Sequence, residues 1–264
     1  MHSPTALDTS RVQGDDSPSP TWPVADMSWS LGKASAVAGV GILLLALFAG
    51  FGYPFAVAGL VTEDDPARTA ADILGSKNLF RLGILSLFLA AVLDVVIAWS
   101  LYRVFSPVSD SISRLASWLR LAYAAVFLVA ISHLVGVLRL LSDADYLTVF
   151  SSDQLQTQAL LRINTYTDVW HAGLILFGLH LLVIGYLAYR SGFMPKLLGI
   201  LLAIAGAGYV FDSIAGVLVD GSVPDVTAFT FIGEFLLALW LVVWGRRVTV
   251  ATSERHDYRI GTAS

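Results

Sequence analysis

Six apolar segments, each long enough to cross a lipid bilayer, dominate this sequence. Each has about 20 or more residues, the number that spans a ~30 Å hydrocarbon core as an α-helix. Because lipid offers the backbone no hydrogen-bond partner, and the segments lack the alternation of barrel strands, they are predicted to be helices. The predicted fold class is therefore an all-α membrane bundle of six transmembrane helices. The segments cover residues 34–61, 79–102, 115–141, 166–189, 196–219 and 226–245.

The composition agrees with a membrane protein. Hydrophobic residues make up 56% of the chain and charged residues 14%, and the mean hydropathy is +0.72. A soluble domain of this length needs more polar surface. The net charge of −4 gives no basic surface, so nucleic acid is not predicted as a partner. The absence of cysteine excludes disulfides and thiolate chemistry.

Polar segments flank the apolar region. Residues 1–33 are rich in proline, serine and acidic residues and are predicted to form a disordered tail. Residues 34–247 are predicted to form the six-span domain, and residues 248–264 a second polar tail. The first apolar segment starts too far along the chain, and is too long, for a signal peptide.

Lysine and arginine are concentrated on one side of the predicted bundle. Cytoplasmic loops carry the excess of these residues, so both termini are predicted to face the cytoplasm, with the lipid bilayer as a partner. No pattern specifies an oligomeric state. The residues assigned to the cytoplasmic side are Lys33, Arg103, Arg114, Arg120, Arg190, Lys196, Arg246, Arg247, Arg255 and Arg259.

Two loops on the opposite, more acidic side contain signals for the start of a helix. Asp65 before Pro66 is typical of an N-cap followed by the first helical residue. Ser151 and Gln154 have the spacing of a capping box. We therefore predict short surface helices in these outer loops, and a fourth span whose helix begins outside the bilayer.

Ionisable residues inside the apolar segments are the candidates for function, because each is unfavourable in lipid unless it is paired or faces water. Counted at 1.5 Å per residue, several lie in or just above one layer, roughly 8–12 Å below the outer surface. Charges at one depth are stabilised when they meet. The sequence thus predicts a charged ligand-binding pocket in the outer half of the bundle. Its predicted members are Arg81, His133, Arg139, Asp168, His171, Asp212 and Glu234.

A second candidate pair lies deeper. Asp94 and His180 have closely matching depths near the middle of the bilayer, which predicts a direct contact between them. On the fifth segment, Gly208, Asp212 and Gly216 follow one another at four-residue spacing. This pattern favours close helix packing and would direct Asp212 towards a neighbouring helix.

Metal and nucleotide sites have weak support. His133, His171, Asp212 and Glu234 are suitable ligand types for zinc or iron, but no HxxxH or HExxH spacing accompanies them. Residues 206–208, Gly-Ala-Gly, lie inside an apolar segment without a preceding strand, so they indicate packing rather than a dinucleotide site. No metal and no other cofactor is predicted.

One segment is similar to a known family. Residues 185–199, GYLAYRSGFMPKLLG, continue through 205–213, AGAGYVFDS. With residues 79–83 (LFRLG), 177–180 (FGLH) and 231–234 (FIGE), they resemble the bacterial family called domain of unknown function 4386. The resemblance covers roughly residues 34–247. It implies a six-helix inner-membrane protein of uncharacterised activity.

Three classes of function remain open. The pattern favours a non-catalytic membrane protein, a sensor or partner subunit, whose pocket binds a small molecule from the outer side; no catalytic residue is predicted. The alternative is a small-solute or proton-coupled transporter in which His171, Asp212 and Glu234 carry protons. A transporter often shows inverted repeats or broken helices, and neither is evident. A membrane-embedded enzyme acting on lipid is the third class. The same polar residues could also form a purely structural network.

Overall fold

The computed structural model describes residues 30–142, 144–218 and 227–245, with the backbone alone at 217 and 227–231. All regular structure within these ranges is helical, which confirms the all-α prediction. The elements are α1 Leu31–Gly50, η1 Phe51–Phe55, η2 Ala58–Leu60, α2 Pro66–Gly75, α3 Lys77–Phe105, α4 Asp110–Leu140, η3 Asp145–Leu147, α5 Ser152–Arg190, α6 Lys196–Leu218 and α7 Thr227–Val243. The predicted terminal tails lie largely outside the described residues.

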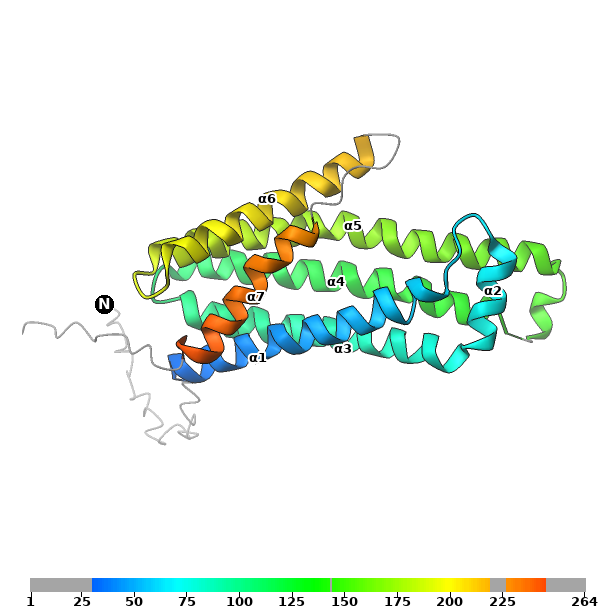
Figure 1. The fold of residues 1–264 in the computed structure, drawn as a ribbon, viewed down its shortest axis with the longest axis horizontal. Helices are drawn as coiled ribbons and strands as arrows, with labels where there is room; N and C mark the ends of the chain where they lie inside the picture. Colours follow the sequence, from blue (N-terminus) through cyan, green and yellow to red (C-terminus); the bar gives the residue numbers. More distant parts are fainter. Residues whose placement is uncertain (1–29, 143, 219–226, 246–264) are drawn as a thin grey trace, which may run out of the picture.

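Six helices form a closed ring. Going around it, α1 contacts α3, α3 contacts α4, and the contacts continue through α5, α6 and α7 back to α1. One end of the ring, here called the Ser30 end, holds the start of α1 and the α3–α4 and α5–α6 connections; the other, the α2 end, carries α2 (Figure 1). Towards Leu218, α6 inclines away from α5, and α7 covers only the half of the bundle near the Ser30 end (Figure 1).

Five of these helices are long and apolar enough to cross a membrane: Leu31–Leu60, Lys77–Phe105, Asp110–Leu140, Ser152–Arg190 and Lys196–Gly216. The sixth predicted segment corresponds to α7, whose described apolar stretch, Ile232–Val243, is shorter. The described residues therefore support a multi-pass membrane protein, with five helices of full spanning length rather than the six predicted.

The predicted helix starts in the loops are present. The Asp65 side chain accepts a hydrogen bond from the backbone N–H of Arg68 (2.9 Å), and Pro66 occupies the first turn of α2. Ser151 and Gln154 cap each other at the start of α5. With 39 residues, α5 is about 58 Å long at 1.5 Å per residue, so it extends well beyond a bilayer core.

Glycines bring α5 and α6 into backbone contact. A Cβ added to Gly178 would lie 2.6 Å from the carbonyl oxygen of Gly206, and one added to Gly185 would lie 2.7 Å from that of Gly199. A Cβ at Gly216, by contrast, would meet nothing within 4 Å. The close helix packing predicted for Gly208, Asp212 and Gly216 therefore does not extend to Gly216. Towards its end, α6 diverges from α5 (Figure 1).

Candidate functional site

A cavity of about 340 Å³ lies inside the helix ring and is partly open. Every helix of the ring contributes to its wall, so the site exists only when the whole bundle is assembled. The wall is mainly apolar and aromatic, with two carboxylates, as is usual for small-molecule sites. Its chemically distinctive residues are Tyr53, Asp94, Tyr123, Phe127, Tyr166, Trp170, Phe177, Tyr209, Glu234 and Phe235.

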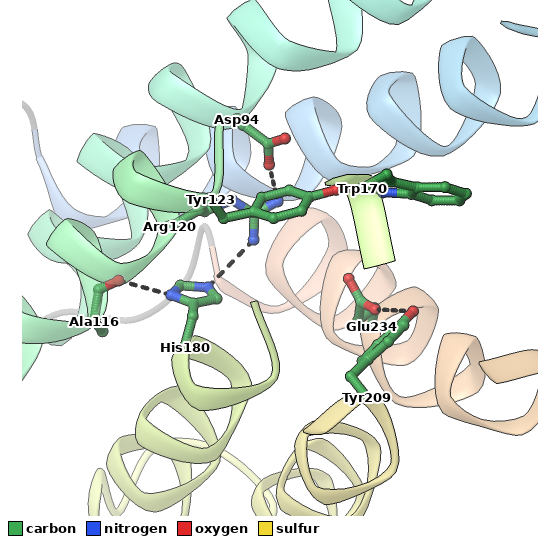
Figure 2. Close-up of polar contacts among 8 residues, drawn as sticks. All are labelled: Asp94, Ala116, Arg120, Tyr123, Trp170, His180, Tyr209 and Glu234. Carbon is green, nitrogen blue, oxygen red and sulfur yellow. Dashed lines mark hydrogen bonds and ion pairs between the residues drawn. The ribbon is translucent and has the colours of Figure 1, made fainter. Parts of the chain in front are cut away.

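A buried charged chain crosses three helices at one edge of this cavity (Figure 2). Arg120 on α4 lies 2.7 Å from Asp94 Oδ1 on α3, and both side chains are 2% exposed. Its other terminal nitrogen lies 3.2 Å from Nε2 of His180 on α5. The His180 ring also lies 2.8 Å, at Nδ1, from the carbonyl oxygen of Ala116. Arg120 therefore links α3 to α5.

These contacts define the state of His180. A guanidinium only donates hydrogen bonds and a carbonyl oxygen only accepts them. His180 must therefore accept at Nε2 and donate from Nδ1, which makes the ring neutral. The guanidinium also lies over the Phe177 ring, 5.2 Å from its centroid, a favourable position for a cation. The local charge is thus an Asp94–Arg120 ion pair beside a neutral histidine.

The depths of Asp94 and His180 were predicted to match, and each lies about ten residues, or ~15 Å, from the Ser30 end of its helix. Their contacts run through Arg120 rather than directly between them. Arg120 itself was assigned to the cytoplasmic surface, and this is wrong. Because α4 starts at Asp110, Arg120 sits three turns inside the helix and is fully buried.

Glu234 lies on the α7 wall of the cavity. It accepts a hydrogen bond from the Tyr209 hydroxyl on α6, at 3.1 Å. In Figure 2 the Glu234–Tyr209 pair and the Asp94–Arg120–His180 chain occupy separate positions around the same space. The cavity therefore brings two carboxylates together with one guanidinium.

Aromatic rings form a continuous wall from this charged edge towards the α2 end. Centroid separations are 4.9 Å for Tyr123 and Phe177, 5.8 Å for Tyr123 and Phe127, and 6.2 Å for Phe127 and Trp170. The Trp170 indole N–H donates to the Tyr123 hydroxyl at 3.2 Å, which fixes both rings. Further along, Tyr53 lies 5.2 Å from Tyr166 and 5.3 Å from Trp170, centroid to centroid.

Most of the predicted pocket members do not meet. Of the seven, Glu234 alone is among the described residues lining the cavity. Arg81, Arg139, Asp168 and His171 are exposed, and Asp212 is partly buried in α6. Asp168 borders a separate cavity of about 310 Å³ together with Glu63. His133 is paired with Arg162 at 3.3 Å, near Arg139. The seven predicted residues therefore do not line one common cavity.

The physical reason lies in the positions of these residues along their helices. Arg81 lies in the second turn of α3 and Arg139 in the last turn of α4. The helix α5 begins well before the apolar segment that was predicted for it. At helix ends, long side chains reach the interface without a protein partner. Equal depth therefore does not require contact there.

The described residues include no group of three or more histidine, aspartate or glutamate side chains that could hold a metal ion. The arrangement can bind by stacking, hydrogen bonding and charge.

Comparison with known proteins gives a family but no activity. The family model for a domain of unknown function (DUF4386) matches residues 37–245. A protein of Archaeoglobus fulgidus described as uncharacterised is 36% identical over 173 residues, which cover 64% of this chain and 88% of that protein. No solved structure matches the chain. The chain belongs to the DUF4386 family, the one that its sequence resembles.

Proposed function

We propose that this chain is a six-span inner-membrane protein, with both termini in the cytoplasm, that binds a small organic cation in the aromatic cavity without catalysing a reaction. In this arrangement the α2 end faces outwards and α7 is the sixth span. Five helices of spanning length and the apolar α7 support the topology. Without Arg120, nine lysines and arginines remain assigned to the cytoplasmic side in the sequence, against five on the other side, so the positive bias is smaller but keeps its direction.

The charge balance of the cavity is the observation that carries the proposal. Arg120 compensates Asp94, and the hydrogen bonds of His180 make it neutral. Glu234 accepts a hydrogen bond from Tyr209 but forms no ion pair with a described lysine or arginine. When Glu234 is ionised, the site carries one excess negative charge in a poorly hydrated space. A cationic ligand would neutralise it.

The aromatic wall selects the kind of cation. Tyrosine, tryptophan and phenylalanine faces attract ammonium groups and organic cations within about 6 Å of the ring centroid. The Tyr166 hydroxyl is buried and has no hydrogen-bond partner among the described residues, so it offers a further polar contact. At about 340 Å³, the cavity suits a molecule the size of an aromatic amine. A small hydrated metal ion would leave most of this wall unused.

A proton-coupled transporter is the alternative class, because protonation of Glu234 would also neutralise the site. Transport needs a path past the middle of the bundle. Asp94 and Arg120 are each 2% exposed and His180 is 0% exposed, and together they connect α3, α4 and α5 at that level. This packing favours a one-sided binding pocket.

Benzyltrimethylammonium binding to the full-length protein in nanodiscs tests the proposal. We expect saturable quenching of tryptophan fluorescence by the cation and none by benzenesulfonate, an anion of similar size. Glu234→Gln should weaken binding at least about tenfold, since it removes a charged contact. Asp168→Asn is the matched control, because Asp168 is an exposed carboxylate outside the cavity. Equal binding of cation and anion, or equal losses in the two variants, would refute the proposal.

A further inference from the structure

A third cavity, of about 420 Å³, lies between α3, α4 and α5 at the α2 end, and its charged lining residues are positive. Arg139 and Arg162 both line it, with Ser132 and the apolar Phe88, Val135 and Leu140. No described acidic residue lines it, and no ion pair joins either arginine to a described carboxylate. Two guanidinium groups therefore share one cavity without a counter-charge.

The hydrogen bonds around this cavity leave it rich in donors. Arg162 can only donate, so its contact with His133 Nδ1 at 3.3 Å makes that nitrogen an acceptor. His133 is not among the residues that line the cavity, so its contact serves to hold the Arg162 guanidinium. The two arginines retain further unused N–H groups. Two planar guanidinium groups lining one cavity match the oxygens of a phosphate group.

The level of the cavity indicates where such a phosphate would come from. Arg162 lies 28 residues from the end of α5 at Arg190, about 42 Å, and Arg139 lies 29 residues from the start of α4 at Asp110, about 44 Å. A bilayer with its headgroup regions is ~40–45 Å thick. If the helices span the membrane, both arginines lie at the level of the outer headgroups.

We infer that Arg139 and Arg162, the latter held by His133, bind the phosphate of a membrane phospholipid headgroup at the outer surface. The apolar Phe88, Val135 and Leu140 would contact the glycerol and the first acyl carbons. Further towards the middle of the bundle, Val92 on α3 and Val129 on α4 are exposed and apolar as well. The inference rests on the membrane placement proposed above and is independent of the cation site.

Lipid binding to the full-length protein in delipidated detergent micelles tests the inference. Three ligands of matched chemistry are compared by native mass spectrometry and thermal shift: dioctanoyl phosphatidylglycerol, dioctanoylglycerol, which lacks the phosphate, and glycerol 3-phosphate, which lacks the acyl chains. We expect saturable binding of one phosphatidylglycerol. Arg162→Gln and Arg139→Gln should each weaken it about tenfold, and Arg162→Lys should recover part of the loss by retaining the charge.

Arg81→Gln is the matched control, because Arg81 is an exposed arginine at the same end of the bundle and does not line the cavity. The affinity of the Arg81→Gln variant for dioctanoyl phosphatidylglycerol should stay within about twofold of wild type. Glu234→Gln should leave lipid binding unchanged, which separates this site from the cation site. If glycerol 3-phosphate binds as tightly as the lipid, the phosphate site stands but its ligand is soluble and the lipid assignment fails. Equal binding of dioctanoylglycerol, or an equal loss in Arg81→Gln, would overturn the site itself.

Discussion

Charged residues in the middle of the bundle and at its α2 end follow different rules. In the middle, Asp94 and Arg120 are 2% exposed and lie 2.7 Å apart on different helices. At the α2 end, Arg81 and Arg139 are exposed, and neither has an ion pair with a described carboxylate. Burial makes pairing necessary because an isolated charge in a low-dielectric interior is strongly unfavourable. At helix ends, water and lipid headgroups can satisfy the same charges.

The largest effect is expected at Arg120. Arg120→Gln leaves Asp94 buried without its cation and also removes a hydrogen bond to His180, so the free energy of unfolding should fall by ~3–5 kcal/mol. Unfolding by SDS titration, followed by circular dichroism, measures this. Arg81→Gln makes the same chemical change at the exposed end and should stay within ~0.5 kcal/mol of wild type. Similar losses in the two variants would remove the contrast between the regions.

A double-mutant cycle sharpens the same comparison. Asp94→Asn in the Arg120→Gln background should recover part of the lost stability, because both members of the buried pair are then neutral. The coupling free energy is expected to be ~1–3 kcal/mol. Additivity of the two substitutions in the same SDS assay would mean that the 2.7 Å contact contributes no net interaction.

Two of the tyrosines that line the cavity, Tyr209 and Tyr166, provide a smaller, matched test. Tyr209→Phe removes the hydroxyl that donates to Glu234, and should lower the free energy of unfolding by ~1–2 kcal/mol. Tyr166→Phe removes a buried hydroxyl without a described hydrogen-bond partner, and should change it by less than ~0.5 kcal/mol or increase it slightly. Thermal unfolding in nanodiscs compares them. If Tyr166→Phe lowered the free energy of unfolding more than Tyr209→Phe, the Tyr209–Glu234 hydrogen bond would not be the stabilising one.

The smallest effect is expected at the Asp110–Arg114 pair on the first turns of α4. Both side chains are about half exposed, at 48% and 53%. Arg114→Gln should therefore cost no more than ~0.5 kcal/mol, and the difference should decrease with added salt. A salt-independent loss of several kcal/mol would show that this end of the bundle behaves like its middle.

The helices could be predicted from the sequence because each apolar segment must satisfy its own backbone in lipid. The capped starts of α2 and α5 could be predicted as well, since capping is a local property of a few neighbouring residues. The sixth segment was predicted to be a full span, whereas its described apolar stretch is shorter than the others. Hydropathy does not reveal where a helix starts within a run.

The site was less predictable because depth alone does not specify partners. Matching depth identified Asp94 and His180, yet the arginine that connects them was assigned to the surface. The signal that could have found it is the start of α4: a serine and an aspartate at 109 and 110 precede the apolar run, so Arg120 lies three turns inside. The aromatic wall gave no comparable signal, because aromatics are common throughout membrane helices.

The position of a bound cation tests the central claim most directly. Crystals grown with 4-iodobenzyltrimethylammonium would locate the iodine by its anomalous scattering. The account predicts one peak inside the helix ring among Tyr123, Trp170 and Tyr209, with the ammonium beside Glu234, and no such peak in Glu234→Gln. A peak only on the lipid-facing surface, or an equally strong peak in the Glu234→Gln cavity, would contradict it.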